Sequence, residues 1–184
     1  MGAISNLRSI TPPKLGWILD DPGRIEAFLS SDPPPFDEKQ EGPDFAADST
    51  RYGLTIRLEK SSDGLCYLLT RQAWEETPSL DCTALSEQFV YETKVGCCVA
   101  SYLTAQQAAA VFALIEPLTQ DDLRRTLRPR SDAMNADLIY PSDGTSYWFW
   151  NEGDFPWLWE NFVRLREFYR AVAANGNAVL SWLN

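Results

Sequence analysis

The amino-acid sequence predicts an α+β fold in which several helices cover a mixed β-sheet. Apolar and polar residues alternate at 54–58, which is typical of a half-buried strand. Apolar residues recur at intervals of three and four at 158–172, which is typical of a helix packed on a core. At 184 residues the chain has the length of one ordinary domain and can bury one core. We therefore expect a single domain over residues 1–184.

The first 30 residues predict one strand and two short helices. Residues 3–10 are a candidate opening strand. Thr11 and Pro12 then supply an N-cap and a first-turn proline, which together favour the start of a helix. A second pair of this kind begins at Asp21.

The segment at about 30–50 predicts a mobile, acidic, proline-rich loop. Its three adjacent prolines cannot donate backbone hydrogen bonds and favour an extended polyproline conformation. A surface insertion without a specific role and a partner-binding arm both fit such a loop. If it is an arm, its carboxylates are the candidate contacts, and these include Asp37, Glu38 and Glu41.

The middle of the chain predicts strand, helix and an interrupted strand. A helix at 60–70 follows the alternating stretch, and residues 89–103 resemble strand material broken at Gly96. Thr104 and Gln107 have the spacing of a capping box, which predicts that a helix starts there.

A short basic helix is expected after Thr119 and before Pro129. Its arginines fit either a solvated helix end, where cations suit the helix dipole, or an anion site. These arginines are Arg124, Arg125, Arg128 and Arg130.

The C-terminal region predicts a short strand at 136–141, a long helix and a final strand at 177–184. We expect Asp154 to cap the helix and Gly176 to end it, because glycine tolerates the left-handed backbone of a helix C-terminus.

Between these elements, the stretch SYWFWNEGDFPWLWENF at 146–162 carries eight aromatic residues in seventeen positions. In an extended chain, Trp148 and Trp150 would share one face and Tyr147 and Phe149 the other. One face can join the core, and the second must meet another layer, a ligand or a partner protein. The candidate binding residues of this stretch are Trp148, Trp150, Glu152 and Trp157.

Three parts of the sequence together resemble the bacterial YfbM-like family, also described as domain of unknown function 1877. They are the opening MG with the helix PPKLGWILDDP, the motif RLEKSSDGLCYLLT, and the end LIYP followed by FVRLREFYRAVAANGNAVLSWL. The resemblance implies one α+β domain with a mixed sheet covered by helices, and it implies no settled activity.

The central motif matches that family in part. Glu59 stands where the family has aspartate, and Cys66 stands where it has histidine. Lys60 and Asp63 match the family pattern, whereas Ser62 replaces a tryptophan. Losing a histidine and a tryptophan favours a structural motif over a catalytic one, with Lys60 and Asp63 as a surface pair on a helix.

The composition argues against several classes of chemistry. The chain contains no histidine, which removes the Ser-His-Asp and Cys-His arrangements and histidine-ligated metals. It has no glycine-rich phosphate loop or calcium loop, so we expect no cofactor and no metal site. We expect the four cysteines, which lack C-x-x-C spacing, to be small buried residues, although Cys66 is also a conceivable nucleophile.

Charge and targeting signals bear on the partner and the location. The net charge of −10 disfavours nucleic acid and anionic membranes and favours a basic protein partner. The N-terminus lacks the pattern of a secretory signal, so we expect a cytoplasmic protein.

Two functional hypotheses follow. The first is a non-catalytic protein-binding module, for example an immunity or antitoxin protein that neutralises a basic toxin. The alternative is a small-molecule-binding protein or an enzyme that uses the aromatic cleft with Lys60, Asp63 and Glu152.

Overall fold

The fold was analysed in a computed structural model that describes residues 5–30, 55–59, 61–70, 88–95, 98–127 and 153–183. The described elements, in chain order, are β1 (Ser5–Ile10), α1 (Pro12–Asp20), α2 (Arg24–Ser30), β2 (Thr55–Glu59), α3 (Ser61–Thr70), β3 (Gln88–Val95), β4 (Cys98–Leu103), α4 (Ala105–Ile115), α5 (Gln120–Leu127), α6 (Phe155–Ala174) and β5 (Ala178–Leu183). The α+β fold predicted from the sequence is confirmed.

Five strands form one sheet in the order β2-β1-β5-β4-β3, and their described pairings are antiparallel. The last strand, β5, lies in the middle of the sheet, between β1 and β4. Strand β2 lies at one edge, where it pairs with β1 through contacts such as Ile56 with Leu7.

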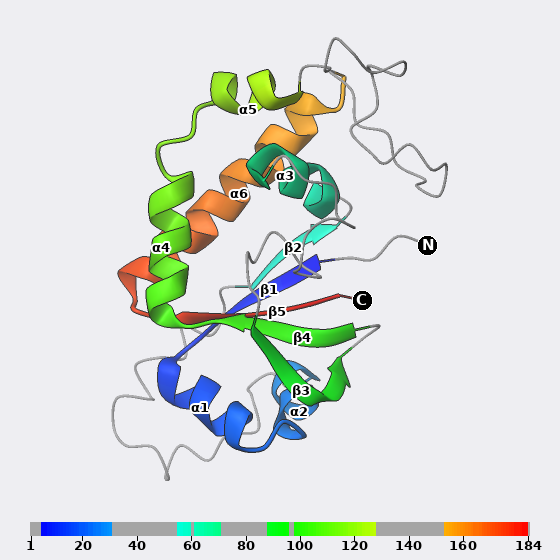
Figure 1. The fold of residues 1–184 in the computed structure, drawn as a ribbon, viewed down its shortest axis with the longest axis vertical. Helices are drawn as coiled ribbons and strands as arrows, with labels where there is room; N and C mark the ends of the chain where they lie inside the picture. Colours follow the sequence, from blue (N-terminus) through cyan, green and yellow to red (C-terminus); the bar gives the residue numbers. More distant parts are fainter. Residues whose placement is uncertain are drawn as a thin grey trace.

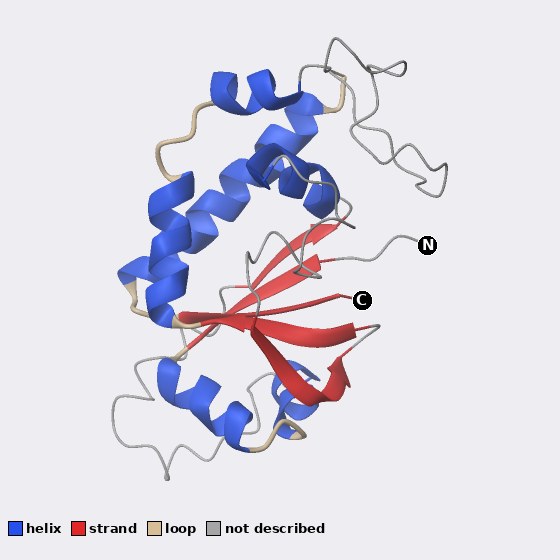
Figure 2. Cartoon of the chain, viewed as in Figure 1, coloured by secondary structure: helices blue, strands red, loops and turns tan. Residues whose placement is uncertain are grey.

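Helices cover both faces of this sheet (Figures 1 and 2). Helices α3, α4, α5 and α6 lie on one face, and α1 and α2 lie on the other. The two faces carry separate hydrophobic clusters because successive side chains of a strand point to opposite sides. In β1, for example, Leu7 belongs to the first cluster and Ile10 to the second.

Helix α6 is the main contributor to the larger cluster. Its apolar residues recur at three- and four-residue intervals, and burial of each Leu or Phe contributes about 1.5–3 kcal/mol. The fully or almost fully buried ones are Phe155, Leu158, Phe162, Leu165, Phe168, Tyr169 and Val172.

The sheet face beneath α6 also carries small polar residues. Ser101 of β4 and Ser181 of β5 are buried, and their hydroxyl oxygens lie 3.1 Å apart in a hydrogen bond. Asn177, which follows α6, donates a side-chain hydrogen bond of 2.9 Å to the hydroxyl of Ser9 in β1. These pairs satisfy polar groups that would otherwise be costly to bury.

Two of the predicted helix signals are confirmed in detail. Thr104 and Gln107 form both bonds of a capping box at the start of α4. At the end of α6, Gly176 has a φ of 63°, and its N–H bonds to the carbonyl of Ala173. The N–H of Asn177 bonds back to the carbonyl of Val172, which completes a Schellman motif.

Two expectations were wrong. Asp154 occupies the N-cap position of α6, but its backbone is helical and its side chain makes no capping bond. The start of α6 is favoured instead by Pro156 in its first turn. Cys66 is fully buried, as expected, but it is disulfide-bonded and is therefore not a free thiol.

Candidate binding groove

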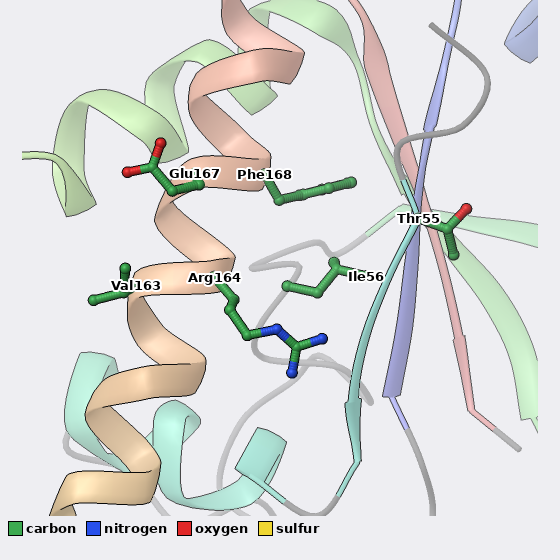
Figure 3. A pocket seen from close by; sticks show the side chains of 6 residues that line it. All are labelled: Thr55, Ile56, Val163, Arg164, Glu167 and Phe168. Carbon is green, nitrogen blue, oxygen red and sulfur yellow. The ribbon is translucent and has the colours of Figure 1, made fainter. Parts of the chain in front are cut away.

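An open groove lies between helix α6 and the edge strand β2 (Figure 3). It has a volume of about 350 Å³. Its lining residues are Thr55, Ile56, Val163, Arg164, Glu167 and Phe168.

The strand and the helix each contribute an apolar side chain to the groove. Alternation in β2 turns Ile56 toward the helix layer, while Thr55 and Arg57 are exposed. Ile56 points from β2 toward α6, and Phe168 points from α6 toward β2. The bottom of the groove is therefore hydrophobic.

Arg164 links the helix to the main chain of the edge strand. Its Nη1 donates to the Oδ1 of Asn161 at 3.1 Å, and its Nη2 lies 3.5 Å from the carbonyl oxygen of Arg57. Asn161 is itself buried and donates through Nδ2 to the carbonyl of Trp157 at 3.0 Å. A continuous set of hydrogen bonds thus runs from Trp157 to β2.

Glu167 is the acidic residue that lines the groove, and its charge is matched locally. Nη1 of Arg170 donates to both carboxylate oxygens, at 2.8 and 2.7 Å. Such an exposed ion pair adds little stability, but it cancels the charge of Glu167 at the rim. Arg164 is therefore the cationic side chain that lines the groove, whereas Arg57 is exposed on the other side of the strand.

Trp157 is the predicted binding residue that falls within the described residues, and it is not among those that line the groove. It lies in the first turn of α6 and is 37% exposed, which is unusual for a large aromatic side chain. The other predicted contacts lie outside the described residues, and they are Asp37, Glu38, Glu41, Lys60, Trp148, Trp150 and Glu152.

The remaining family-motif positions fall at the start of α3 and the end of β2. Glu59 pairs through its backbone with Ser5, and Asp63 lies in α3, although the side chains of both are outside the described set. Cys66 is enclosed in the core, away from the groove lining.

The described part of the aromatic stretch is mostly core. Phe155 and Phe162 are fully buried, and Trp159 stacks on Phe162 with ring centroids 5.4 Å apart. Only Trp157 is exposed among these four aromatic residues at the start of α6.

The arginines of α5 serve structural contacts. The guanidinium of Arg124 lies 4.7 Å from the ring centroid of Phe155, a cation–π contact that joins α5 to α6. Arg125 pairs with Asp122 one turn earlier. The helix-end interpretation is therefore favoured for these two residues, while Arg128 and Arg130 lie outside the described residues.

A cationic cluster that the sequence did not predict lies on the opposite face of the sheet. Lys14 in α1 is only 1% exposed, and its Nζ lies 5.7 Å from the ring centroid of Phe28 in α2. The guanidinium of Arg8 lies 4.7 Å from the same centroid and donates to the carbonyl of Phe28. Lys14 sits on the apolar side of α1 beside Leu15 and Ile18, so its helical position could have predicted burial.

Two other kinds of feature are absent from the described ranges. They contain no group of three or more Cys, Asp or Glu residues arranged to hold a metal ion. None of the helices described is long and apolar enough to cross a membrane.

Comparison with known proteins supports the fold. The chain is similar to a protein of unknown function, YfbM from Escherichia coli, whose crystal structure matches with a TM-score of 0.58 and 18% sequence identity. That match covers 98% of this chain and 99% of the other. No curated protein matched the chain. The model of the family called Domain of unknown function (DUF1877) matches residues 1–182, so the chain belongs to this YfbM-like family.

Proposed function

We propose that the protein is a non-catalytic protein-binding module that holds an extended segment of a partner in the groove between α6 and β2. The observation that carries this proposal is the open, apolar-floored groove directly beside an edge strand. Within the described residues, β2 pairs with β1 alone. An edge strand presents backbone N–H and C=O groups that an added strand can use, while side-chain pockets beside it provide specificity.

The groove has the chemistry of a binding surface. Its polar side chains are Thr55, Arg164 and Glu167, and the carboxylate of Glu167 is held by Arg170. The entire sequence lacks histidine, the usual general base near neutral pH. Binding without turnover is the simplest use of such a groove.

The net charge supports a basic partner in solution. Acidic and basic residues are nearly balanced in the described parts of the chain, so most of the charge of −10 comes from the other segments. Negative potential from those segments would steer a basic protein toward this one. Neutralisation of a basic toxin domain in the cytoplasm is the specific role that we propose on this ground.

A small molecule is the alternative occupant. The groove volume of about 350 Å³ lies within the range of ligand pockets, which runs from roughly 300 to 1,000 Å³. An open groove would, however, bury less of a small ligand than the 70–90% that is common for such sites.

Site-specific photo-crosslinking in cells tests the proposal. A benzophenone amino acid replaces Val163 in the groove or, as a control, Leu114, which is 67% exposed on α4. We expect a discrete protein adduct from position 163, lost when Arg164→Glu is added, and none from position 114. Equal adducts at both positions, or none at 163, would contradict a groove that binds protein.

Co-expression tests the narrower toxin-neutralising role. The product of the neighbouring open reading frame is expressed with and without this chain, and cell growth is measured. Growth arrest that the wild-type chain relieves supports neutralisation. A neighbouring product that is harmless, or whose toxicity this chain leaves unchanged, contradicts it.

A further inference from the structure

We infer that the groove between α6 and β2 takes an acidic segment of a partner protein that is basic overall, added as a strand alongside β2, with acidic and apolar residues in alternation. This inference rests on the proposed function and adds the chemistry of the bound segment. It is carried by the charges around the groove and by the spacing of its side chains.

Within the described residues, two arginines lie at the groove and at the edge strand beside it. Arg57 is exposed on β2, and Arg164 is exposed on the facing side of α6. Both carboxylate oxygens of Glu167 accept hydrogen bonds from Arg170. Because salt screens exposed charges beyond about 8–10 Å, a bound segment responds mainly to charges close to it, and these two arginines are such charges.

Arg164 is held in place to receive a carboxylate. Asn161 fixes one side of its guanidinium, and the carbonyl of Arg57 contacts the other. A guanidinium has five N–H donors in a planar fork, so donors remain after these two contacts. A guanidinium held in this position can donate to both oxygens of a carboxylate, which a mobile lysine would do less well.

The alternation of side chains in a strand predicts the pattern of the bound segment. Ile56 faces the groove, whereas Arg57, the next residue, faces the other side of the sheet edge. An added strand would place every second side chain against Ile56 and Phe168, where apolar groups are favoured. The intervening side chains would lie near Arg57, where opposite charges across two strands are stabilising.

Arg164 adds a second preference for acid. Its side chain extends from α6 toward β2, near the backbone of Arg57. An acidic residue at either end of the segment could reach it without entering the apolar floor. A segment of alternating Val and Glu has the required apolar and acidic side chains. A segment of alternating Val and Lys has the same apolar residues and alternation but carries positive charge.

Fluorescence anisotropy with two labelled probe peptides tests the inference on the full-length chain. Both probes have nine residues, one with alternating Val and Glu and the other with alternating Val and Lys. We expect the glutamate probe to bind at least about 10-fold more tightly, with an affinity that falls as salt rises. Arg57→Glu and Arg164→Glu should each weaken its binding about 10-fold, whereas Arg125→Glu on α5, remote from the groove, should not.

The outcomes separate the inference from the proposed function. The inference of an acidic segment is contradicted if the lysine probe binds more tightly, or if Arg164→Glu leaves binding of the glutamate probe unchanged. The proposed function is still supported in either case if the photo-crosslinks at position 163 are observed. The inference is also contradicted if neither probe binds. The proposed function is contradicted as well only if the photo-crosslinks at position 163 are absent. Thermal unfolding of each variant verifies that a lost signal does not come from a lost fold.

Discussion

The guanidinium of Arg164 in α6 lies 3.5 Å from the main-chain carbonyl of Arg57 in β2, although the two residues are 107 positions apart in the chain. This contact joins the long helix to the edge of the sheet, and Arg164 also lines the groove. An arginine at a sheet edge can protect the edge from unwanted pairing. It can also receive a partner of suitable charge, which is the role that we propose.

The turn after α6 provides a test of the backbone geometry. Gly176 has a φ of 63° with open space where a Cβ would stand, so Gly176→Ala should destabilise the fold by about 1–2 kcal/mol through backbone strain alone. Gly16 in α1 also has open space but lacks a positive φ, and Gly16→Ala should stabilise by about 0.5–1 kcal/mol. Urea unfolding measures both, and changes of the same sign would contradict the assigned conformations.

The buried serine pair should show energetic coupling. Ser101→Ala and Ser181→Ala should each cost about 1 kcal/mol, because each leaves the other hydroxyl without this bond. The double variant should cost less than the sum of the two, since the second substitution removes a hydroxyl that has already lost this bond. A double-mutant cycle in urea gives this coupling, and strict additivity would show that the hydroxyls do not interact.

Asp122 predicts a specific dependence on pH. The hydroxyl of Thr119 donates to its carboxylate at 2.6 Å and the N–H of Thr119 at 3.0 Å, and with the charge of Arg125 these hold the pKa of Asp122 below its usual 3.8. A lowered pKa in the folded state adds stability above the unfolded pKa, and this stability is lost as pH falls below about 3.8.

Two measurements test this dependence. A carbon-detected NMR titration of Asp122 should give a midpoint below 3.8, which Thr119→Ala should raise. The stability advantage of the wild-type chain over Asp122→Asn should shrink as the pH falls through that value. A midpoint at or above 3.8, or an advantage that grows at low pH, would oppose the assigned bonds.

The state of Cys66 predicts a chemical result. Since Cys66 is disulfide-bonded, its peptide should appear linked to a second cysteine peptide when the purified chain is digested without reductant. Alkylation of denatured, unreduced protein should leave Cys66 unmodified. Quantitative alkylation at Cys66 would contradict the disulfide. The same assay on freshly lysed cells tests the cytoplasmic location, because disulfides persist mainly in oxidising compartments.

Much of the fold could be predicted from local patterns. The period of apolar residues identified α6, and the Thr104 capping box and Gly176 marked helix ends, because these signals depend on residues close together in the sequence. Asp154 was placed correctly at the N-cap position, but the sequence could not show that its backbone is helical and that its side chain makes no capping bond.

The groove could not be predicted in the same way. It joins residues 55–56 to residues 163–168, and it exists because α6 crosses the sheet close to β2. Periodicity shows which face of a helix is buried, but it does not show which strand that face meets or which strand forms the edge. Trp157 was a candidate because an aromatic-rich stretch is a local signal, and it does not line the groove, whereas Arg164 looked like an ordinary surface arginine.

Hydrogen–deuterium exchange of the full-length chain, with and without the alternating Val and Glu probe, tests the central claim most directly. We predict slower exchange at Thr55–Glu59 and at 163–168, with α1 and α2 on the opposite face unchanged. Unaltered exchange in β2 and α6, or protection confined to the opposite face, would contradict the account that this groove is the binding site.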